Sequence, residues 1–254
     1  MMERYEMLIE KLNKREKVVG TTMIMLPDPI LLEKMVHPDL DFVLMDAEHG
    51  CFDTQNVIPM LQTCRMLGVP GFMRVQDSQY HLIAKAIDMG ADGVMIPRVE
   101  TLEQMHTVVD AVRFAPEGRK GAGGFGQFHP GESFEHFQKS RMVMIQIESQ
   151  KGIDNLPSIL ENYGDHISAV MIGPNDLSVM LGTPFALRSA AMERAVQAIF
   201  DISARYGKSC GIFCNDVGDA AHYRAMGANV LWTASDLQFY CRGFAETMNE
   251  LKAL

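Results

Sequence analysis

Charged side chains stand directly after short apolar runs at several places in the chain. Asp46 and His49 follow one such run, Arg74 ends a second, Glu148 closes a third, and Asp176 follows a fourth. Carboxylates bind hard cations, imidazole carries protons near neutral pH, and a guanidinium binds oxyanions. These residue types together predict metal-assisted proton transfer on a substrate that carries an oxyanion.

Two of the carboxylates are candidates for a shared metal ion. Glu148 shares a face of its predicted strand with Gln146, because side chains two positions apart point the same way. A buried carboxylate needs an ion, a basic partner or water, so the alternative to a metal is a salt bridge to Arg98 or Lys151. Asp176 begins a predicted helical turn, where the alternative is an N-cap. If both converge on one ion, Mg²⁺ or Mn²⁺ fits best.

The remaining candidates would act on substrate oxygens and protons. Arg74 is either a structural partner for a carboxylate or a clamp for a substrate oxyanion. His49 is a candidate proton carrier. Asp46, three positions earlier, is predicted to hold a ring nitrogen of His49 and to favour one tautomer.

The elements that must position these residues form a regular alternation of strands and helices. The apolar runs lack strict alternation, as expected of parallel strands covered on both faces, and amphipathic segments separate them. The eight predicted strands are 18–25, 42–48, 70–75, 93–99, 142–149, 167–173, 209–214 and 229–235. This pattern predicts an α/β protein with one domain, a (β/α)₈ barrel over residues 1–254, whose chemistry lies at the C-terminal strand ends. The last segment, 236–254, is predicted to be a helix that packs on this barrel or on another subunit.

Composition excludes several classes of function. The net charge is −9, from 23 basic and 32 acidic residues, and no basic run could follow a phosphate backbone, so nucleic acid is excluded. No signal peptide or bilayer-spanning segment is present, which predicts a cytoplasmic protein without membrane contact. The five cysteines are scattered and predict no disulfide framework. Cys210 and Cys214 lie on one predicted strand, too far apart to share an ion, and are expected in the core.

Three motifs, in this order, resemble those of a known family. "MDAEHG", "MIQIES" and "MIGPNDLS" are similar to the motifs of the HpcH/HpaI aldolase family, the metal-dependent class II pyruvate aldolases. That family includes 4-hydroxy-2-oxoheptanedioate aldolase and 2-keto-3-deoxy-sugar-acid aldolases. The match runs through nearly the whole chain, and "GPNDLS" paired with an upstream "QIE" is its specific part. The resemblance implies cleavage or formation of a 4-hydroxy-2-oxo acid from pyruvate and an aldehyde, through a pyruvate enolate held by Mg²⁺, Mn²⁺ or Co²⁺.

The resemblance also implies roles for individual residues. The metal ligands would be Glu148 and Asp176. The pyruvate pocket would be lined by Gln146, Gly173 and Pro174, and Arg74 would face the enolate oxygen.

Proton transfer and assembly follow from the same resemblance. His49, supported by Asp46, would move the proton. The oligomer would be a homohexamer in which the last helix packs on a neighbour, and Asp88 would reach the site of the adjacent subunit.

One loop departs from the family pattern, which puts the choice of aldehyde in doubt. Residues 121–134 read "GAGGFGQFHPGESF", and 121–126 formally match G-x-G-x-x-G. A dinucleotide site would need this motif between a strand and a helix, whereas it follows a predicted helix end. A flexible lid over the barrel mouth is the simpler interpretation.

Three rival functions remain open. A Schiff-base aldolase requires a lysine inside the barrel, and only Lys151 lies near a strand end. An acyl-CoA lyase of the citramalyl or malyl type would use a related barrel. A non-catalytic barrel that binds a 2-oxo acid is the third, although His49, Arg74, Glu148 and Asp176 together argue against it.

Overall fold

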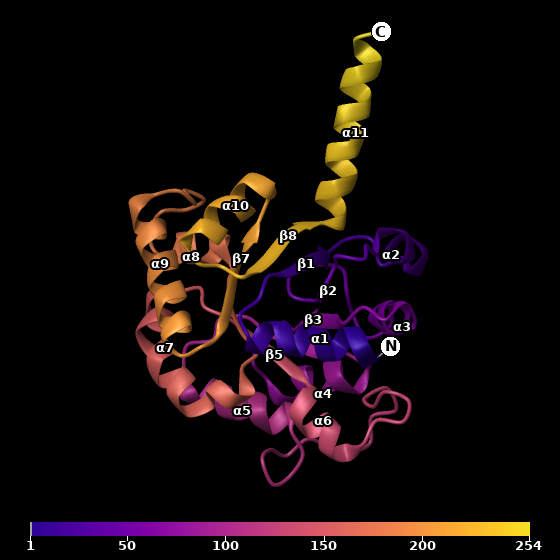
Figure 1. Cartoon of the computed structure of the whole chain (residues 1–254), viewed down its shortest axis with the longest axis vertical. Helices are drawn as coiled ribbons and strands as arrows, with labels where there is room; N and C mark the ends of the chain where they lie inside the picture. The colour runs from indigo at the N-terminus through magenta and orange to yellow at the C-terminus, as the bar shows by residue number, and fades with distance from the viewer. Residues whose placement is uncertain (1) are drawn as a thin grey trace.

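A closed barrel of eight parallel strands forms the centre of the computed structural model, which describes residues 2–254 (Figure 1). Each strand pairs with the next in chain order, and β8 pairs with β1. The strands are β1 Val18–Met23, β2 Phe42–Asp46, β3 Gly71–Arg74, β4 Gly93–Ile96, β5 Met142–Gln146, β6 Ala169–Ile172, β7 Ser209–Cys214 and β8 Val230–Ser235. The predicted (β/α)₈ barrel is confirmed. Six of the eight strands end earlier than predicted, because the residues after them turn into the βα loops.

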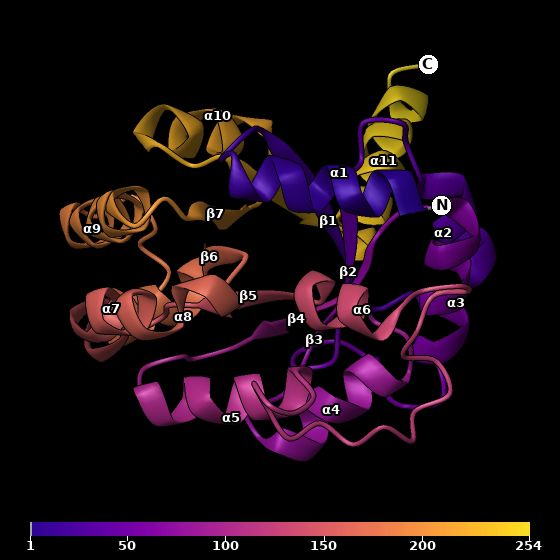
Figure 2. The same cartoon turned by 60° about the horizontal axis from the view of Figure 1, so that its bottom comes forward.

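Most of the helices surround the barrel as an outer ring (Figure 2). The helices of the chain are α1 Met2–Asn13, α2 Pro29–Met35, α3 Val57–Leu67, α4 Tyr80–Asp88, α5 Leu102–Val112, α6 Phe134–Ser140, α7 Gln150–Tyr163, α8 Pro174–Met180, α9 Ala190–Arg205, α10 Val217–Met226 and α11 Asp236–Lys252. None of these helices in residues 2–254 is long and apolar enough to cross a membrane.

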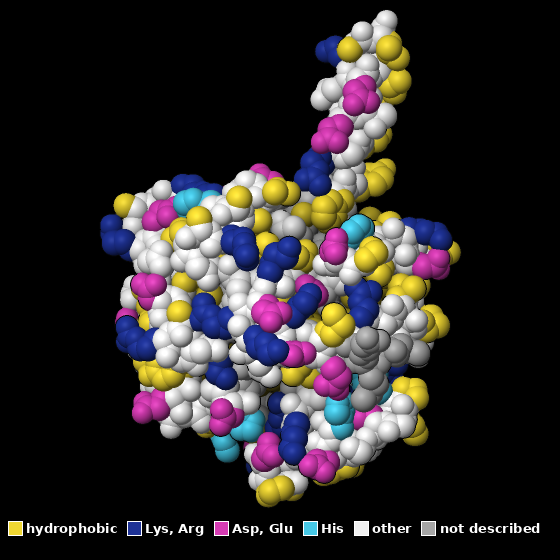
Figure 3. Space-filling view, in the orientation of Figure 1, with side chains coloured by type: hydrophobic (Ala, Val, Ile, Leu, Met, Phe, Trp, Pro, Cys, Tyr) yellow, Lys and Arg dark blue, Asp and Glu magenta, His cyan; other side chains and the backbone are white. Residues whose placement is uncertain are grey.

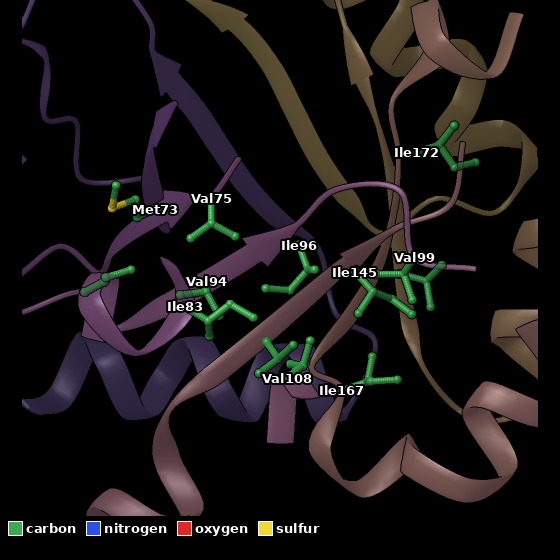
Figure 4. Packing of buried hydrophobic residues seen from close by; sticks show 14 of the residues in the cluster. Met73, Val75, Ile83, Val94, Ile96, Val99, Val108, Ile145, Ile167 and Ile172 are labelled. Atoms are coloured by element: carbon green, nitrogen blue, oxygen red, sulfur yellow. The ribbon is translucent and has the colours of Figure 1, made fainter. Parts of the chain in front are cut away.

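The main hydrophobic core lies between the strands and this ring. Figure 4 shows Val94, Ile96 and Ile145 of the strands beside Ile83 of α4 and Val108 of α5, and all five are fully buried. Burying about 25 cal/mol per Å² of apolar surface is the main force that holds each helix to the sheet. Cys210 and Cys214 belong to this core, as predicted.

A second apolar cluster fills the inside of the barrel and closes one end. Tyr5, Leu8 and Leu12 of α1 join the inward-facing side chains of the strands, among them Phe72 and Trp232. Helix α1 therefore covers the N-terminal ends of the strands. Access to the interior is left at the C-terminal ends, where barrel enzymes carry their chemistry.

Helix α11 leaves the body of the molecule (Figure 1). Among its residues only Asp236 is buried, and the space-filling view shows hydrophobic side chains along one side of the projecting helix (Figure 3). Beyond its first turn the helix does not lie on its own barrel in this structure, and packing on another subunit stays a prediction.

The prediction of a glycine-rich lid over the barrel mouth is wrong. The backbone N–H of Gly126 donates to the carbonyl of Asp88 at 3.1 Å, and Arg65 of α3 donates to the carbonyl of Gly126 at 3.0 Å. These contacts hold the loop against α3 and the end of α4, outside the barrel. No strand leads into it, so the Rossmann interpretation lacks its structural context.

Candidate active site at the C-terminal end of the barrel

A cavity of about 440 Å³ opens at the C-terminal ends of the strands. It is lined by six of the predicted site residues, which are Asp46, His49, Arg74, Gly173, Pro174 and Asp176. Gln146 and Glu148 lie beneath it at the end of β5, in contact with Arg74 and Gly173. The barrel thus brings together residues from four strand ends that span 130 positions of sequence.

A buried ion pair joins the ends of β2 and β3. Asp46 and Arg74 are direct partners in the strand register, and the guanidinium donates to both carboxylate oxygens, at 2.9 Å from Nε and 2.5 Å from Nη2. Asp46 Oδ1 also accepts the backbone N–H groups of Glu48 and His49. The prediction that Asp46 holds the ring of His49 is therefore wrong, because both of its oxygens are already occupied.

Arg74 is aimed at the centre of the site by that pair. Its Nη1 lies 3.4 Å from Gln146 Oε1 and 3.3 Å from Glu48 Oε2. Burial would lower the pKa of Arg74, but Asp46, Glu48 and Glu148 outweigh it and raise that pKa. The guanidinium is a permanent cation at the cavity wall.

His49 makes fewer contacts than Arg74 at the cavity wall. Its side chain is about half exposed, and its nearest charged partner is Glu48, with Nε2 3.8 Å from Oε2. A ring that lines the cavity and has no strong hydrogen bond is free to exchange a proton with a bound substrate.

Glu148 is buried among other acids. It accepts a hydrogen bond from Gln146 Nε2 at 2.8 Å and one from the backbone N–H of Arg98 at 3.1 Å. Burial, followed by the charges of Asp176 and Glu48, raises the pKa of Glu148 to about 8. The Glu148 carboxylate therefore lacks enough nearby positive charge to balance its own negative charge.

The predicted alternative for Glu148, a salt bridge, does not form. The guanidinium of Arg98 pairs with Glu48 and donates to the carbonyl of Gln76. Lys151 lies 3.1 Å from Glu100. Neither basic side chain neutralises Glu148.

Asp176 is equally unpaired. The N-cap of α8 is Gly173, so Asp176 does not cap the helix, and it forms no salt bridge with any other residue between 2 and 254. A Cβ on Gly173 would lie 1.9 Å from Glu148 Oε1. Only glycine lets the backbone before α8 approach Glu148 this closely.

A divalent cation fits this pair. No group of three or more His, Cys, Asp or Glu side chains in residues 2–254 forms a closed metal cage. Mg²⁺ and Mn²⁺ do not need one, because they accept one or two carboxylates and complete their shell with water and substrate oxygens. Two acids that repel each other across a cavity, with no basic partner, are a donor set of that kind.

Asp88 lies elsewhere. It ends α4, just before β4 begins, and forms an ion pair with the buried amine of Lys120. The α4–β4 turn belongs to the N-terminal end of the barrel, so Asp88 is not part of the site of its own chain.

Two residues that organise the candidate site were given no such role by sequence reasoning. Glu48 is buried between Arg74 and Arg98 and joins β2 to the ends of β3 and β4. Arg98 adopts a left-handed backbone (φ 49°), which aims its N–H at Glu148. Glu48 stands within the quoted "MDAEHG" motif and Arg98 lies near the end of the predicted strand 93–99, so the position of each residue pointed to the site.

The fold and this arrangement of acids, guanidinium and imidazole define a barrel enzyme with its site at the strand ends. Comparison with known proteins identifies the family of this enzyme. A family model described as HpcH/HpaI aldolase/citrate lyase matches residues 23–242. The chain belongs to that family and is a carbon–carbon lyase.

Individual relatives agree. The chain is 32% identical over 219 residues to a 5-keto-4-deoxy-D-glucarate aldolase of Klebsiella pneumoniae subsp. pneumoniae, with 84% of each chain covered. A solved HpcH/HpaI aldolase from Desulfitobacterium hafniense DCB-2 superposes with a TM-score of 0.88 at 25% identity, covering 96% of both chains. An HpcH/HpaI aldolase/citrate lyase family protein from Burkholderia cenocepacia J2315 gives a TM-score of 0.88 at 25% identity, covering 97% of this chain and 99% of that one.

Proposed function

We propose that this protein is a divalent-metal-dependent aldolase that cleaves or forms a 4-hydroxy-2-oxo acid, with pyruvate and an aldehyde as the partners. One observation carries the proposal. Glu148 is buried beside Asp176 and forms no salt bridge with Arg98 or Lys151, and burial, followed by the charges of Asp176 and Glu48, raises its pKa to about 8. A cation bound between the two carboxylates would remove that deficit of positive charge.

The chain's own residues supply the remaining parts of the reaction. Glu148 and Asp176 would hold Mg²⁺, Mn²⁺ or Co²⁺, which when bound supplies a Lewis acid for the keto oxygen of pyruvate. Gln146 and the Gly173–Pro174 backbone would line the pyruvate pocket. Arg74, fixed by Asp46, would stabilise negative charge on the enolate oxygen without needing to reorganise.

His49 is the group placed to move the proton. Its ring lines the cavity, exposed and weakly held. It would take the proton from the 4-hydroxyl group during cleavage and from C3 of pyruvate during condensation. Asp46 would act on His49 only through the backbone of the loop, as a positioning residue.

A Schiff-base mechanism lacks its nucleophile. No lysine among residues 2–254 lines the cavity, Lys151 is paired with Glu100, and the buried Lys120 is paired with Asp88. This supports the metal-dependent route over an imine.

Purified protein tests the proposal directly. Exhaustive EDTA treatment should abolish cleavage of 4-hydroxy-2-oxo acids, and Mn²⁺, Mg²⁺ or Co²⁺ should restore it. Covalent labelling by pyruvate and borohydride would overturn the metal-dependent route. Activity confined to a CoA thioester would indicate an acyl-CoA lyase, and tight binding of pyruvate without any turnover would indicate a silent barrel.

We further propose that the protein assembles as a homohexamer through α11. Apolar side chains recur on this helix at intervals of three and four residues and are all exposed, namely Leu237, Tyr240, Phe244, Met248 and Leu251. An apolar cavity of about 520 Å³ lies at the base of α11, between it, β1 and α2. A second copy would cover both surfaces, because an unpartnered apolar stripe of this kind marks an interface.

Light scattering of the full chain tests the assembly. The hexamer should be lost in Phe244→Asp and kept in Thr247→Asp, a charge of the same sign on the same helix. In the hexamer Asp88 would face the adjacent copy's site, so Asp88→Ala should lower activity while the hexamer persists. A monomeric wild-type protein with full activity would contradict this part of the proposal.

A further inference from the structure

The cavity has two walls of different chemistry. The wall from β2, β3 and β6 carries all of its charged residues, which are Asp46, His49, Arg74 and Asp176. The opposite wall, from β7, β8 and β1, is formed by neutral side chains, among them Thr22, Phe213, Asn215, Trp232 and Gln238. Because the first wall is assigned above to pyruvate, the second wall is where the aldehyde must lie.

Two amides stand at the rim of the neutral wall. Gln238, in the first turn of α11, donates from Nε2 to Asn215 Oδ1 at 3.1 Å. Its own Oε1 has no hydrogen-bond partner among the described residues. Gln238 lines the cavity, so a hydroxyl group of a bound aldehyde would supply the donor that this acceptor lacks.

The floor of the same wall is aromatic. Phe213 and Trp232 meet edge to face with ring centroids 5.0 Å apart. The indole N–H of Trp232 is already used, since it donates to Thr22 Oγ1 at 2.6 Å. The floor therefore offers apolar surface for a carbon chain and leaves the amides to bind its polar groups.

No side chain in the neutral wall carries a positive charge that could pair with an anionic aldehyde. Arg74 is the only lysine or arginine lining the cavity in residues 2–254, and Asp46 and Glu48 already hold it. Two acids lie behind the wall. Asp236 is buried and accepts backbone N–H groups of the β1 loop, and Asp219 accepts the backbone N–H of Asn215.

Arg188 is too committed to change that balance, because it lies 2.8 Å from Asp219 and stacks on Tyr223. A second carboxylate on the aldehyde would meet negative potential and no partner. Such desolvated, unpaired charge is strongly disfavoured.

We propose that the aldehyde partner of this enzyme is an uncharged, hydroxyl-bearing aldehyde, bound by Asn215 and Gln238 over the Phe213–Trp232 floor, and not a semialdehyde with a second carboxylate. The inference rests on the proposed pyruvate aldolase activity. It names the class of acceptor that the same site would take.

Condensation with pyruvate and Mn²⁺ tests it, using glyceraldehyde, propionaldehyde, glyoxylate and succinic semialdehyde. Glyceraldehyde should have a kcat/KM at least about tenfold above each carboxylated acceptor, since a site of hydrogen-bonding groups discriminates strongly against mismatched ligands. Gln238→Leu with Asn215→Leu should lower kcat/KM for glyceraldehyde about 10- to 100-fold and leave propionaldehyde within about threefold. A glutamine outside the cavity, Gln197, provides the matched control in Gln197→Leu.

Adding a positive charge to the neutral wall should have the opposite effect on acceptor preference. Gln238→Arg should raise kcat/KM for succinic semialdehyde about tenfold. A preference of the wild type for the carboxylated acceptors, or equal losses for glyceraldehyde and propionaldehyde in the double leucine variant, would overturn the inference.

Exchange of the C3 protons of pyruvate with deuterium, measured without any aldehyde, separates the two proposals. Exchange that persists in the wild type and the leucine variants, together with the wrong acceptor preference, sinks only the inference about the aldehyde. Absence of exchange in the metal-loaded wild type sinks the proposed function itself.

Discussion

Two buried glutamates, one at each end of the barrel, have opposite surroundings. At the closed end, Glu132 receives both Nη groups of Arg141, at 2.9 and 2.5 Å, the backbone N–H of His129 and the ring of His136. Burial would raise the pKa of Glu132, but these partners lower it to about 2. At the open end, the pKa of Glu148 is raised to about 8, by burial and by the neighbouring acids Asp176 and Glu48.

The contrast separates structure from function. A buried carboxylate that serves the fold is matched by cations and donors, because an unmatched one costs several kcal/mol. Glu132 meets that condition and ties the segment before α6 to Arg141, which precedes β5. Glu148 does not, and the protein tolerates the cost at the point where its chemistry is expected.

The largest effect should come from removing the open-end carboxylates. Glu148→Gln or Asp176→Asn should lower kcat/KM for cleavage at least about 1000-fold, since each would remove a proposed ligand of the Lewis-acid cation. Calorimetric titration with Mn²⁺ should show the matching loss of affinity. Full activity in either variant would break the contrast, because the unmatched acids would then have no catalytic use.

At the closed end, removing the buried carboxylate should lower the stability of the fold. Glu132→Gln leaves Arg141 buried without its counter-ion and should lower the free energy of unfolding by about 3–5 kcal/mol, measured by urea denaturation. The difference from wild type should shrink as the pH falls from about 4.5 toward 2. A carboxylate whose pKa is lowered by folding stabilises the fold at pH values above its pKa in the unfolded chain. That stabilisation is lost as the pH falls through its pKa in the folded protein. Exposed Glu135→Gln serves as the control and should be nearly neutral.

Without metal, the same substitution at the open end should have the opposite sign. In EDTA, Glu148→Gln should raise the free energy of unfolding by an amount on the order of 2 kcal/mol at pH 8, because it removes an uncompensated charge. A carboxylate whose pKa is raised by folding does not destabilise the fold below about pH 4.5 and destabilises it fully above about pH 8. The stability gained by Glu148→Gln should therefore vanish in acid. Urea midpoints of both proteins between pH 5 and 8 measure it, and destabilisation across that range would refute the account of Glu148.

The smallest effect should come from Arg98. Arg98→Gly removes a half-exposed guanidinium, worth about 0–1 kcal/mol, and relieves a left-handed backbone that glycine adopts freely. The backbone N–H to Glu148 stays, so stability should change by less than about 1 kcal/mol and activity by less than about tenfold. A loss as large as that of Glu148→Gln would assign the guanidinium itself to the reaction.

Much of this architecture could be predicted from local pattern. The eight apolar runs without strict alternation are strands buried on both faces, and the amphipathic segments between them are helices. Strand-end position alone selected Asp46, Arg74, Glu148 and Asp176, because strand order brings the C-terminal ends of a parallel barrel to one mouth.

Contacts between loops could not be predicted in this way. Asp46 was assigned to the ring of His49 from its spacing, whereas register with β3 gives it to Arg74. The glycine-rich loop was placed over the mouth, yet Arg65 and Asp88 hold it outside. Both errors have one cause, since the deciding partner lies 28 or more residues away in sequence.

The sequence by itself determined the order of the strands and which polar residues follow each of them at the mouth of the barrel, because apolar patterning and strand order are local properties of the chain. Only the tertiary structure decided which of those charges are neutralised. Whether a buried carboxylate meets a guanidinium, as Glu132 does, or another acid, as Glu148 does, depends on distances of a few ångströms between segments remote in sequence.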